Sequence, residues 1–190
     1  MGMAALQEHR WTRQEVLALP DDGNKYELID GELLVSPSPR GLHQRGVYEL
    51  TRLVDPYVRS NRLGYVMCLP ADLDFRADHL LQPDLFVGAM VRGREPIEWS
   101  EYGVPILTVE VLSPSTARYD RITKRRFYQR SGVPNYWIVD LDARLVEEWR
   151  PESERPEILD QVLTWHPAGV EDALNVDLPE YFRSAWGERR

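Results

Sequence analysis

The sequence predicts an α/β (α+β) protein, a mixed β-sheet flanked by helices, and three observations support this fold class. Short apolar or β-branched segments alternate along the chain with segments of helical periodicity, as in a sheet covered by helices. A length of 190 residues suits one domain over residues 1–190. A content of 43% hydrophobic and 28% charged residues is that of a globular chain, and no apolar run is long enough to cross a membrane.

The first expected elements are a short helix and a hairpin. Thr12 and Glu15 have the spacing of a capping box, which predicts a helix beginning there. Two apolar-rich segments, 26–29 and 32–35, are separated by an Asp-Gly pair. We expect them to form a hairpin, because Asp and Gly tolerate the positive φ of a two-residue turn. This turn is the best explanation of Asp30.

A long helix is expected after the hairpin. From residue 42 to about residue 59 the apolar side chains recur at helical spacing, with a kink or a break expected near Pro56. Residues 71–75 alternate between apolar and acidic side chains. This alternation predicts a half-exposed strand with Asp72 and Asp74 on its solvated face.

The second half of the chain is expected to complete the sheet. The predicted elements are strands at 82–87, 106–112, 136–139, 146–149 and 158–165, a helix at 117–130, and a tail at 171–190 that packs back onto the body. The hydroxyl groups of residues 113–116 should cap the helix at 117–130. Gly132 and Pro134 should end that helix.

Charge and cysteine content limit the possible functions. The net charge of −8 argues against a surface that coats nucleic acid indiscriminately, although it allows a local basic strip. Cys68 is the only cysteine, which excludes an intrachain disulfide and a cysteine-based zinc site. Residues 1–10 lack the pattern of a signal peptide, so we expect a cytoplasmic protein.

The basic residues are strongly biased towards arginine. Lys25 and Lys124 are the only lysines, and the other 21 basic residues are arginines. Lysine is not equivalent to arginine where a compact ammonium group is needed. Lys124 directly precedes two arginines, so a need for charge alone does not explain it. Survival of two lysines by chance is the alternative.

Asp84 and Glu110 are candidate metal ligands on neighbouring strands. Glu110 lies within the apolar segment 106–112, where a carboxylate is costly to bury unless it is paired or bound to a cation. Two carboxylates from adjacent strands suit a hard cation such as Mg²⁺. The alternative is a Glu110 that faces solvent. The apolar character of both strand faces argues against it.

Lys124 belongs to the helix that follows the Glu110 strand. Asp120, Lys124 and Tyr128 succeed one another at four-residue spacing and therefore share one helix face. Because the helix follows the strand directly, its first turns can fold back over the strand end. An exposed Asp–Lys pair on the helix surface is the alternative.

Four segments, in this order, resemble the Uma-two family of bacterial proteins, which lies within the PD-(D/E)XK nuclease-like superfamily. They are YELIDGELLVSPSP at 26–39, followed by His43, then QPDLFV at 82–87, LTVEVLSPST at 107–116 and DRITKRRFYQRSGVPNYWIVD at 120–140. The resemblance covers roughly residues 12–182. PD alone is weak evidence, whereas the ordered set of four segments is specific.

The resemblance implies a restriction-endonuclease-like fold and metal-assisted phosphodiester hydrolysis. Asp84, Glu110 and the Val111 carbonyl would hold Mg²⁺ or Mn²⁺, which would polarise a phosphoryl oxygen and activate a water molecule. Leu112 occupies the strand position where the superfamily pattern has lysine. The catalytic lysine would therefore be Lys124 on the next helix, orienting the water and countering the charge on the phosphorus centre.

Five further residues are secondary candidates. Glu27 would add a carboxylate to the site, as the family signature suggests, with a solvent-facing strand residue as the alternative. His43 would contact a phosphate or assist proton transfer, although a lone helical histidine is more often an ordinary polar residue. Arg118, Arg121 and Arg125 lie along one side of the helix and could grip a nucleic-acid backbone, with surface ion pairs as the alternative.

The leading hypothesis is a Mg²⁺-dependent DNA endonuclease, and cutting both strands of a duplex would favour a homodimer. The alternative is a catalytically inactive nuclease-fold module that binds nucleic acid or a protein partner, since a fold does not fix a function. A third option is hydrolysis of another phosphate ester. No motif for sequence-specific DNA recognition is visible.

Overall fold

The computed structural model describes residues 9–68, 73, 79–97, 101 and 103–188. The strand expected at 71–75, with Asp72 and Asp74, lies outside the described residues except for Leu73, which forms a single bridge with Leu81. No helix in the described part of the chain is long and apolar enough to cross a membrane.

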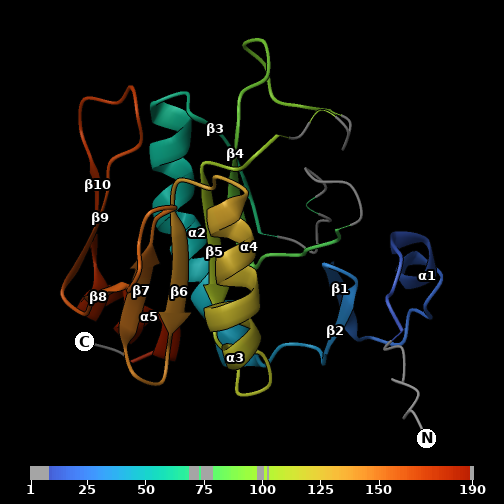
Figure 1. The fold of residues 1–190 in the computed structure, drawn as a ribbon. Helices are drawn as coiled ribbons and strands as arrows, with labels where there is room; N and C mark the ends of the chain where they lie inside the picture. Colours follow the sequence, from blue (N-terminus) through green and yellow to red (C-terminus); the bar gives the residue numbers. More distant parts are fainter. Residues whose placement is uncertain (1–8, 69–72, 74–78, 98–100, 102, 189–190) are drawn as a thin grey trace, which may run out of the picture.

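A six-stranded mixed sheet forms the centre of the molecule, as expected (Figure 1). Its strands, in spatial order, are β3 (Gly64–Met67), β4 (Leu85–Ala89), β5 (Leu107–Val111), β6 (Tyr136–Asp140), β7 (Leu145–Trp149) and β8 (Glu157–Leu159). Only β5 and β6 run parallel; the other neighbours are antiparallel. The parallel pair requires a crossover, and the helical segment between β5 and β6 supplies it.

Helices cover both faces of this sheet (Figure 1). On one face lie α2 (Gly41–Ser60) and α5 (Leu178–Trp186), whose buried side chains join those of β4, β5 and β6 in the largest core cluster. On the other face lies the helical segment α3 (Ala117–Tyr119), η2 (Asp120–Lys124) and α4 (Arg125–Arg130). Phe127 and Tyr128 pack there against Tyr136 and Ile138.

The N-terminal elements sit beside the central sheet. Helix α1 (Arg13–Leu17) begins at the predicted capping box, with both hydrogen bonds between Thr12 and Glu15 present. Strands β1 (Lys25–Ile29) and β2 (Glu32–Ser36) form the predicted hairpin. Its turn has φ of 54° at Asp30 and 81° at Gly31, as an Asp-Gly turn requires.

The structure bears on two helix predictions. Helix α2 is not broken at Pro56 but continues to Ser60, with Val54 and Val58 fully buried on either side of the proline. The expected hydroxyl cap before α3 is absent: Thr116, the N-cap residue, makes no side-chain cap hydrogen bond. The hydroxyl groups of 113–116 bond to one another instead.

Two further departures concern the helix at 117–130 and the strand at 158–165. The helix contains a π-helical turn, η2, which holds both Asp120 and Lys124 in buried positions. The strand is divided between β8 and β9 (Val162–Trp165). Strand β9 pairs with β10 (Leu174–Asp177) in a separate two-stranded sheet, so only β8 extends the central one.

Candidate functional site

The candidate site is a cavity of about 240 Å³ where the hairpin, the central sheet and the helical segment after β5 meet. Its wall includes Lys25, His43, Asp84, Glu110 and Lys124, and much of the remainder is proline and hydroxyl side chains. These residues come from β1, α2, the segment just before β4, β5 and η2. The side chains therefore converge only in the folded chain.

Four buried charges, Glu27, Glu110, Asp120 and Lys124, form an inner cluster that reaches the cavity wall through Glu110 and Lys124. The Lys124 Nζ atom is 2.9 Å from Glu27 Oε2, 3.0 Å from Glu110 Oε1 and 3.3 Å from Asp120 Oδ1. The side chain of each member is at most 2% exposed. Such burial is tolerable because each charge has a partner of opposite sign.

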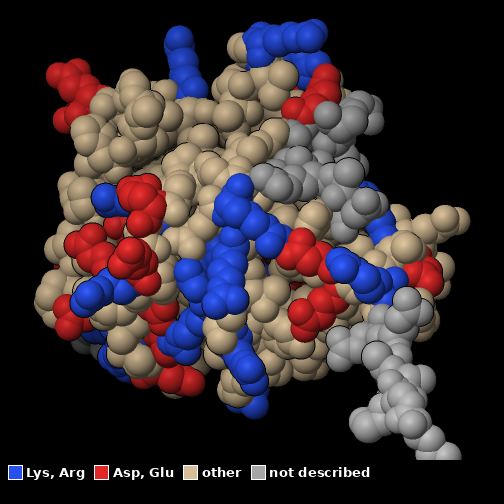
Figure 2. Space-filling view, viewed as in Figure 1, with Lys and Arg blue, Asp and Glu red and all other residues tan. Residues whose placement is uncertain are grey.

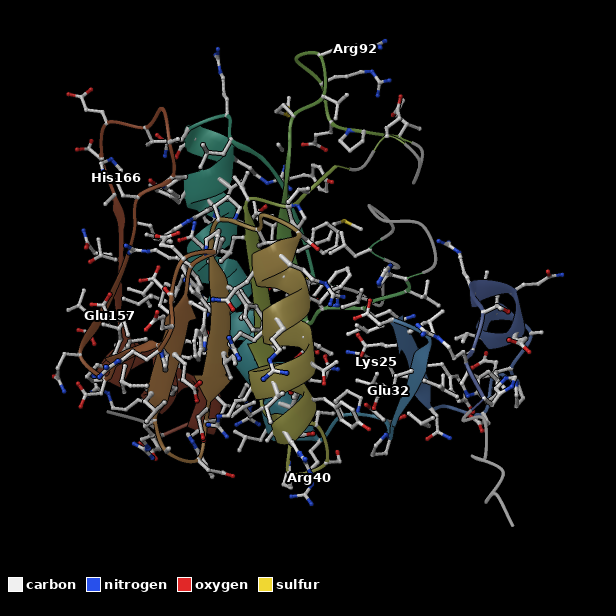
Figure 3. The ribbon with its side chains drawn as sticks, viewed as in Figure 1. Lys25, Glu32, Arg40, Arg92, Glu157 and His166 are labelled. Atoms are coloured by element: carbon white, nitrogen blue, oxygen red, sulfur yellow. The ribbon has the colours of Figure 1, made fainter. Side chains whose placement is uncertain are left out.

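An outer group, Lys25, His43 and Asp84, lies nearer the solvent. The Asp84 Oδ2 atom accepts hydrogen bonds from the Val111 backbone N–H at 2.8 Å and pairs with His43 Nε2 at 3.0 Å. Lys25 Nζ lies 3.9 Å from Asp84 Oδ1 and 3.7 Å from Glu27 Oε2. The Lys25 side chain is 25% exposed, so it is the accessible ammonium group of the site. Figure 3 labels it on β1.

The two groups form one chain of alternating charges, and that chain leaves two carboxylate oxygens available. Glu27 is fully engaged, because Oε1 accepts from the Gln82 backbone N–H and Oε2 contacts both lysines. Glu110 uses Oε1 for Lys124 and for the Tyr128 hydroxyl. Within the described residues, neither Glu110 Oε2 nor Asp84 Oδ1 forms a hydrogen bond, and Lys25 Nζ lies 3.9 Å from Asp84 Oδ1.

The environment shifts the pKa values of these groups in different directions. Burial raises the pKa of the Glu110 carboxyl well above its usual range, although Lys124 and Lys25 oppose the shift, and burial also raises the pKa of Asp120. For Asp84, burial raises the pKa, but the hydrogen bond with His43 and the charge of Lys25 lower it by more, so the net shift is downward.

Lys124 keeps its positive charge. Burial lowers the pKa of its ammonium group, but the opposing charges of Glu110, Glu27 and Asp120 raise it well above the usual value. Two buried phenols complete the surroundings, and burial raises the pKa of both Tyr128 and Tyr136 well above 10.0. Tyr128 therefore donates to Glu110 as a neutral hydroxyl at 3.3 Å.

The donor set fits a hard divalent cation. The four carboxylates of Glu27, Asp84, Glu110 and Asp120 face only two ammonium groups, which leaves excess negative charge, and carboxylate oxygen is the ligand that Mg²⁺ and Mn²⁺ prefer. However, across the described ranges no three His, Cys, Asp or Glu side chains are grouped as metal ligands, because Lys124 stands between the inner carboxylates. A cation would therefore rely on Asp84 and Glu110.

The structure contradicts the alternative that Glu27, Glu110 and Lys124 are surface residues. Glu27 and Glu110 do not face solvent; they are 1% and 2% exposed. Lys124 is not part of an exposed surface pair, because it is buried in the inner cluster. His43 contacts Asp84 directly. Val111, whose backbone carbonyl is a candidate metal ligand, lies in the cavity wall.

Two members of the charge network were not singled out from the sequence. Asp120 was placed only on the same helix face as Lys124, and Lys25 was noted only as the second lysine. The scarcity of lysine was the available signal for Lys25, because both lysines of this arginine-rich chain contact the same carboxylate, Glu27.

The candidate DNA-contacting arginines lie on the outer side of the helical segment. Figure 2 shows basic side chains in a column over α4. Arg121 pairs with Glu147 at 2.6 Å and Asp140 at 3.2 Å, and Arg125 lies over the Trp149 ring at 4.5 Å. Arg118 is exposed, and no ion pair is seen for it in the described part of the structure.

Comparisons with known proteins identify a family and a similar fold. The Uma2 family model, described as "Putative restriction endonuclease", matches residues 13–179. A crystal structure of "a putative nuclease belonging to DUF820" from Anabaena variabilis is similar at 21% sequence identity, covering 92% of this chain and 99% of that chain, with a TM-score of 0.71. No curated protein matches the chain significantly.

A six-stranded mixed sheet covered by helices defines this molecule as an α+β protein with the fold of that solved structure. Because the family model matches most of its length, the chain belongs to the Uma2 family. This membership confirms the family and fold class expected from the sequence and supports a nuclease-like function of the hydrolase type.

Proposed function

We propose that the protein is a metal-dependent DNA endonuclease that hydrolyses phosphodiester bonds in the cavity beside Asp84 and Glu110. One observation carries the proposal: Asp84 Oδ1 and Glu110 Oε2 form no hydrogen bond with the described residues, whereas neighbouring donors fix the other oxygen of each carboxylate. The proposal adds the Val111 carbonyl as a third ligand.

A Mg²⁺ or Mn²⁺ ion bound there would polarise a phosphoryl oxygen and lower the pKa of a water molecule. His43 lies in the cavity wall and positions Asp84 through its hydrogen bond. Lys124 holds Glu110 in place through a hydrogen bond and, from the cavity wall, offsets negative charge at the attacked phosphate.

Lys25 is assigned the direct contact with the substrate phosphate. It lines the cavity, is partly exposed and lies no closer than 3.7 Å to a carboxylate. Lys124, in contrast, is surrounded by three carboxylates. A lysine that is loosely held by its neighbours can turn towards a phosphate, whereas a buried and saturated one holds other groups in place.

The direct test is plasmid DNA incubated with the purified protein and Mg²⁺ or Mn²⁺. The wild type should nick or cut the DNA, and the Asp84→Asn and Glu110→Gln variants should not. Asp160→Asn is a matched control, because Asp160 is exposed in the β8–β9 turn and does not line the cavity. If the wild type and Asp84→Asn leave the DNA equally intact over a range of metal and salt conditions, the proposal is refuted.

A catalytically inactive nucleic-acid or protein-binding module is the second candidate. It is favoured by the position of Lys124, whose ammonium group already neutralises much of the inner cluster. Calorimetric titration with Mn²⁺ separates the two candidates. Endonuclease function requires binding that Glu110→Gln weakens, whereas the module predicts no binding with either protein.

A further inference from the structure

A second cavity, of about 300 Å³, adjoins the first at the ends of the parallel strands β5 and β6. The two cavities share wall residues Arg40, His43, Ser113 and Pro114, so they are adjacent compartments of one depression. Figure 3 labels Arg40, which belongs to both walls. A group held in the second cavity would therefore adjoin a phosphate held in the first.

The wall of the second cavity is mostly apolar. Leu42, Leu112, Pro114, Ala117 and Leu141 contribute to it. These are short or aliphatic side chains without hydrogen-bonding groups, and they offer a surface for a flat, weakly hydrated ligand. Ligand pockets of several hundred Å³ typically combine such walls with a few polar groups.

The polar groups of this cavity decide what kind of ligand it suits. Arg121 donates to Glu147 at 2.6 Å and to Asp140 at 3.2 Å, so its guanidinium charge is already neutralised. Asp142 adds a further carboxylate to the wall. Arg40 also lies in this wall, so two arginines face the two carboxylates of Asp140 and Asp142. The cavity therefore has no excess positive charge that would attract a phosphate, unlike the first cavity with Lys25.

The fixed guanidinium group of Arg121 can still contribute to ligand binding. Its side chain is 39% exposed, and two carboxylates fix its orientation. A guanidinium plane held in this way can stack on a nucleobase, and carboxylates can accept hydrogen bonds from exocyclic amino groups of bases.

We propose that the second cavity binds one unstacked nucleobase of the DNA strand, next to the phosphate that is cut. This inference rests on the proposed endonuclease function and defines its substrate class. A base can enter only if it leaves the double helix, so the enzyme should prefer single-stranded or frayed DNA to continuous duplex.

The test uses single-stranded DNA oligonucleotides in which one base at a time is replaced by an abasic analogue. Loss of the base that occupies the cavity should lower kcat/KM about tenfold or more, the order expected for one base stack. The Ala143→Trp variant fills the cavity from an exposed turn position. This variant should lower kcat/KM for the intact oligonucleotide about as much as the loss of the bound base does. It should not lower kcat/KM further for the oligonucleotide that already lacks that base.

Ala168→Trp is the matched control, because Ala168 also lies in an exposed turn and lines neither cavity. Circular dichroism confirms folding of both variants. Uniform kcat/KM along the abasic series, or equal effects of Ala143→Trp on intact and abasic strands, would overturn the base-binding inference while leaving endonuclease function intact.

If no DNA is cut, the same series is measured by fluorescence anisotropy of labelled oligonucleotides in the presence of Ca²⁺. A position-specific loss of affinity that Ala143→Trp removes would support the base site even in a catalytically inactive module. Binding that is insensitive to every abasic position would overturn it.

Discussion

The inner cluster and the outer group of the candidate site contain the same kinds of residue in different environments. In the inner cluster Lys124 is buried and touches three carboxylates, whereas in the outer group Lys25 is partly exposed and touches two at longer distances. Burial makes every uncompensated charge costly, so the inner lysine is fixed by its partners. Lys25, which its partners hold less tightly, can turn towards a substrate phosphate. The difference separates residues that hold the site from residues that meet the substrate.

The largest expected effect is on stability, from Lys124→Met. Removing this ammonium group leaves three buried carboxylates without their shared partner, which should lower the free energy of unfolding by about 3–5 kcal/mol. Urea denaturation measures the loss. Arg126→Met is the control, because Arg126 lies two residues further along the same helical segment and is exposed, so its replacement should change stability by no more than about 0.5 kcal/mol. Similar losses in both variants would contradict the assignment of Lys124.

Lys25→Met should affect activity and leave stability nearly unchanged. Loss of the phosphate contact should lower kcat/KM by about 100-fold, while the free energy of unfolding changes by less than about 1 kcal/mol because the side chain is partly exposed. Removing this positive charge beside Asp84 should also leave Mn²⁺ affinity unchanged or raise it. A lower Mn²⁺ affinity would show instead that Lys25 positions Asp84.

Metal affinity should depend on pH through the inner cluster. Burial raises the pKa of Glu110, so a proton competes with the cation at a pH where Asp84, whose pKa is lowered, is already ionised. Affinity for Mn²⁺ should therefore fall as the pH decreases through the raised pKa of Glu110, by up to roughly tenfold per pH unit for one proton. Calorimetric titrations at several pH values test this. Glu110→Gln should abolish the dependence along with most of the binding.

The smallest expected effect concerns the arginines on the outer side of the helical segment. Arg118→Ala should reduce the slope of log affinity against log salt for DNA by about 1, because this exposed side chain can release one counterion equivalent. Arg121→Ala should change the slope less, since Glu147 and Asp140 already neutralise its charge. Equal slopes for both variants would remove the distinction between the two arginines.

The sequence grouped Asp84, Glu110 and Lys124, which line one cavity in the structure, but it did not predict the details of the fold around them. Glu110 was identifiable because a carboxylate in a β-branched strand needs a partner, and its burial matches that expectation. The continuation of α2 through Pro56 was not predictable from local rules, because burial of Val54 and Val58 outweighs the proline. The π-helical turn was likewise invisible in a pattern of four-residue spacing.

The sequence by itself determined the alternation of strands and helices, the hairpin turn at Asp30, the family, and the identity of Asp84, Glu110 and Lys124 as one candidate set. Only the tertiary structure decided their partners. It placed Lys25 beside Asp84, enclosed Lys124 among three carboxylates and opened a second cavity at the ends of β5 and β6. The reason is physical: periodicity determines which face a side chain occupies, whereas charge pairing and cavities depend on distances between segments far apart in the chain.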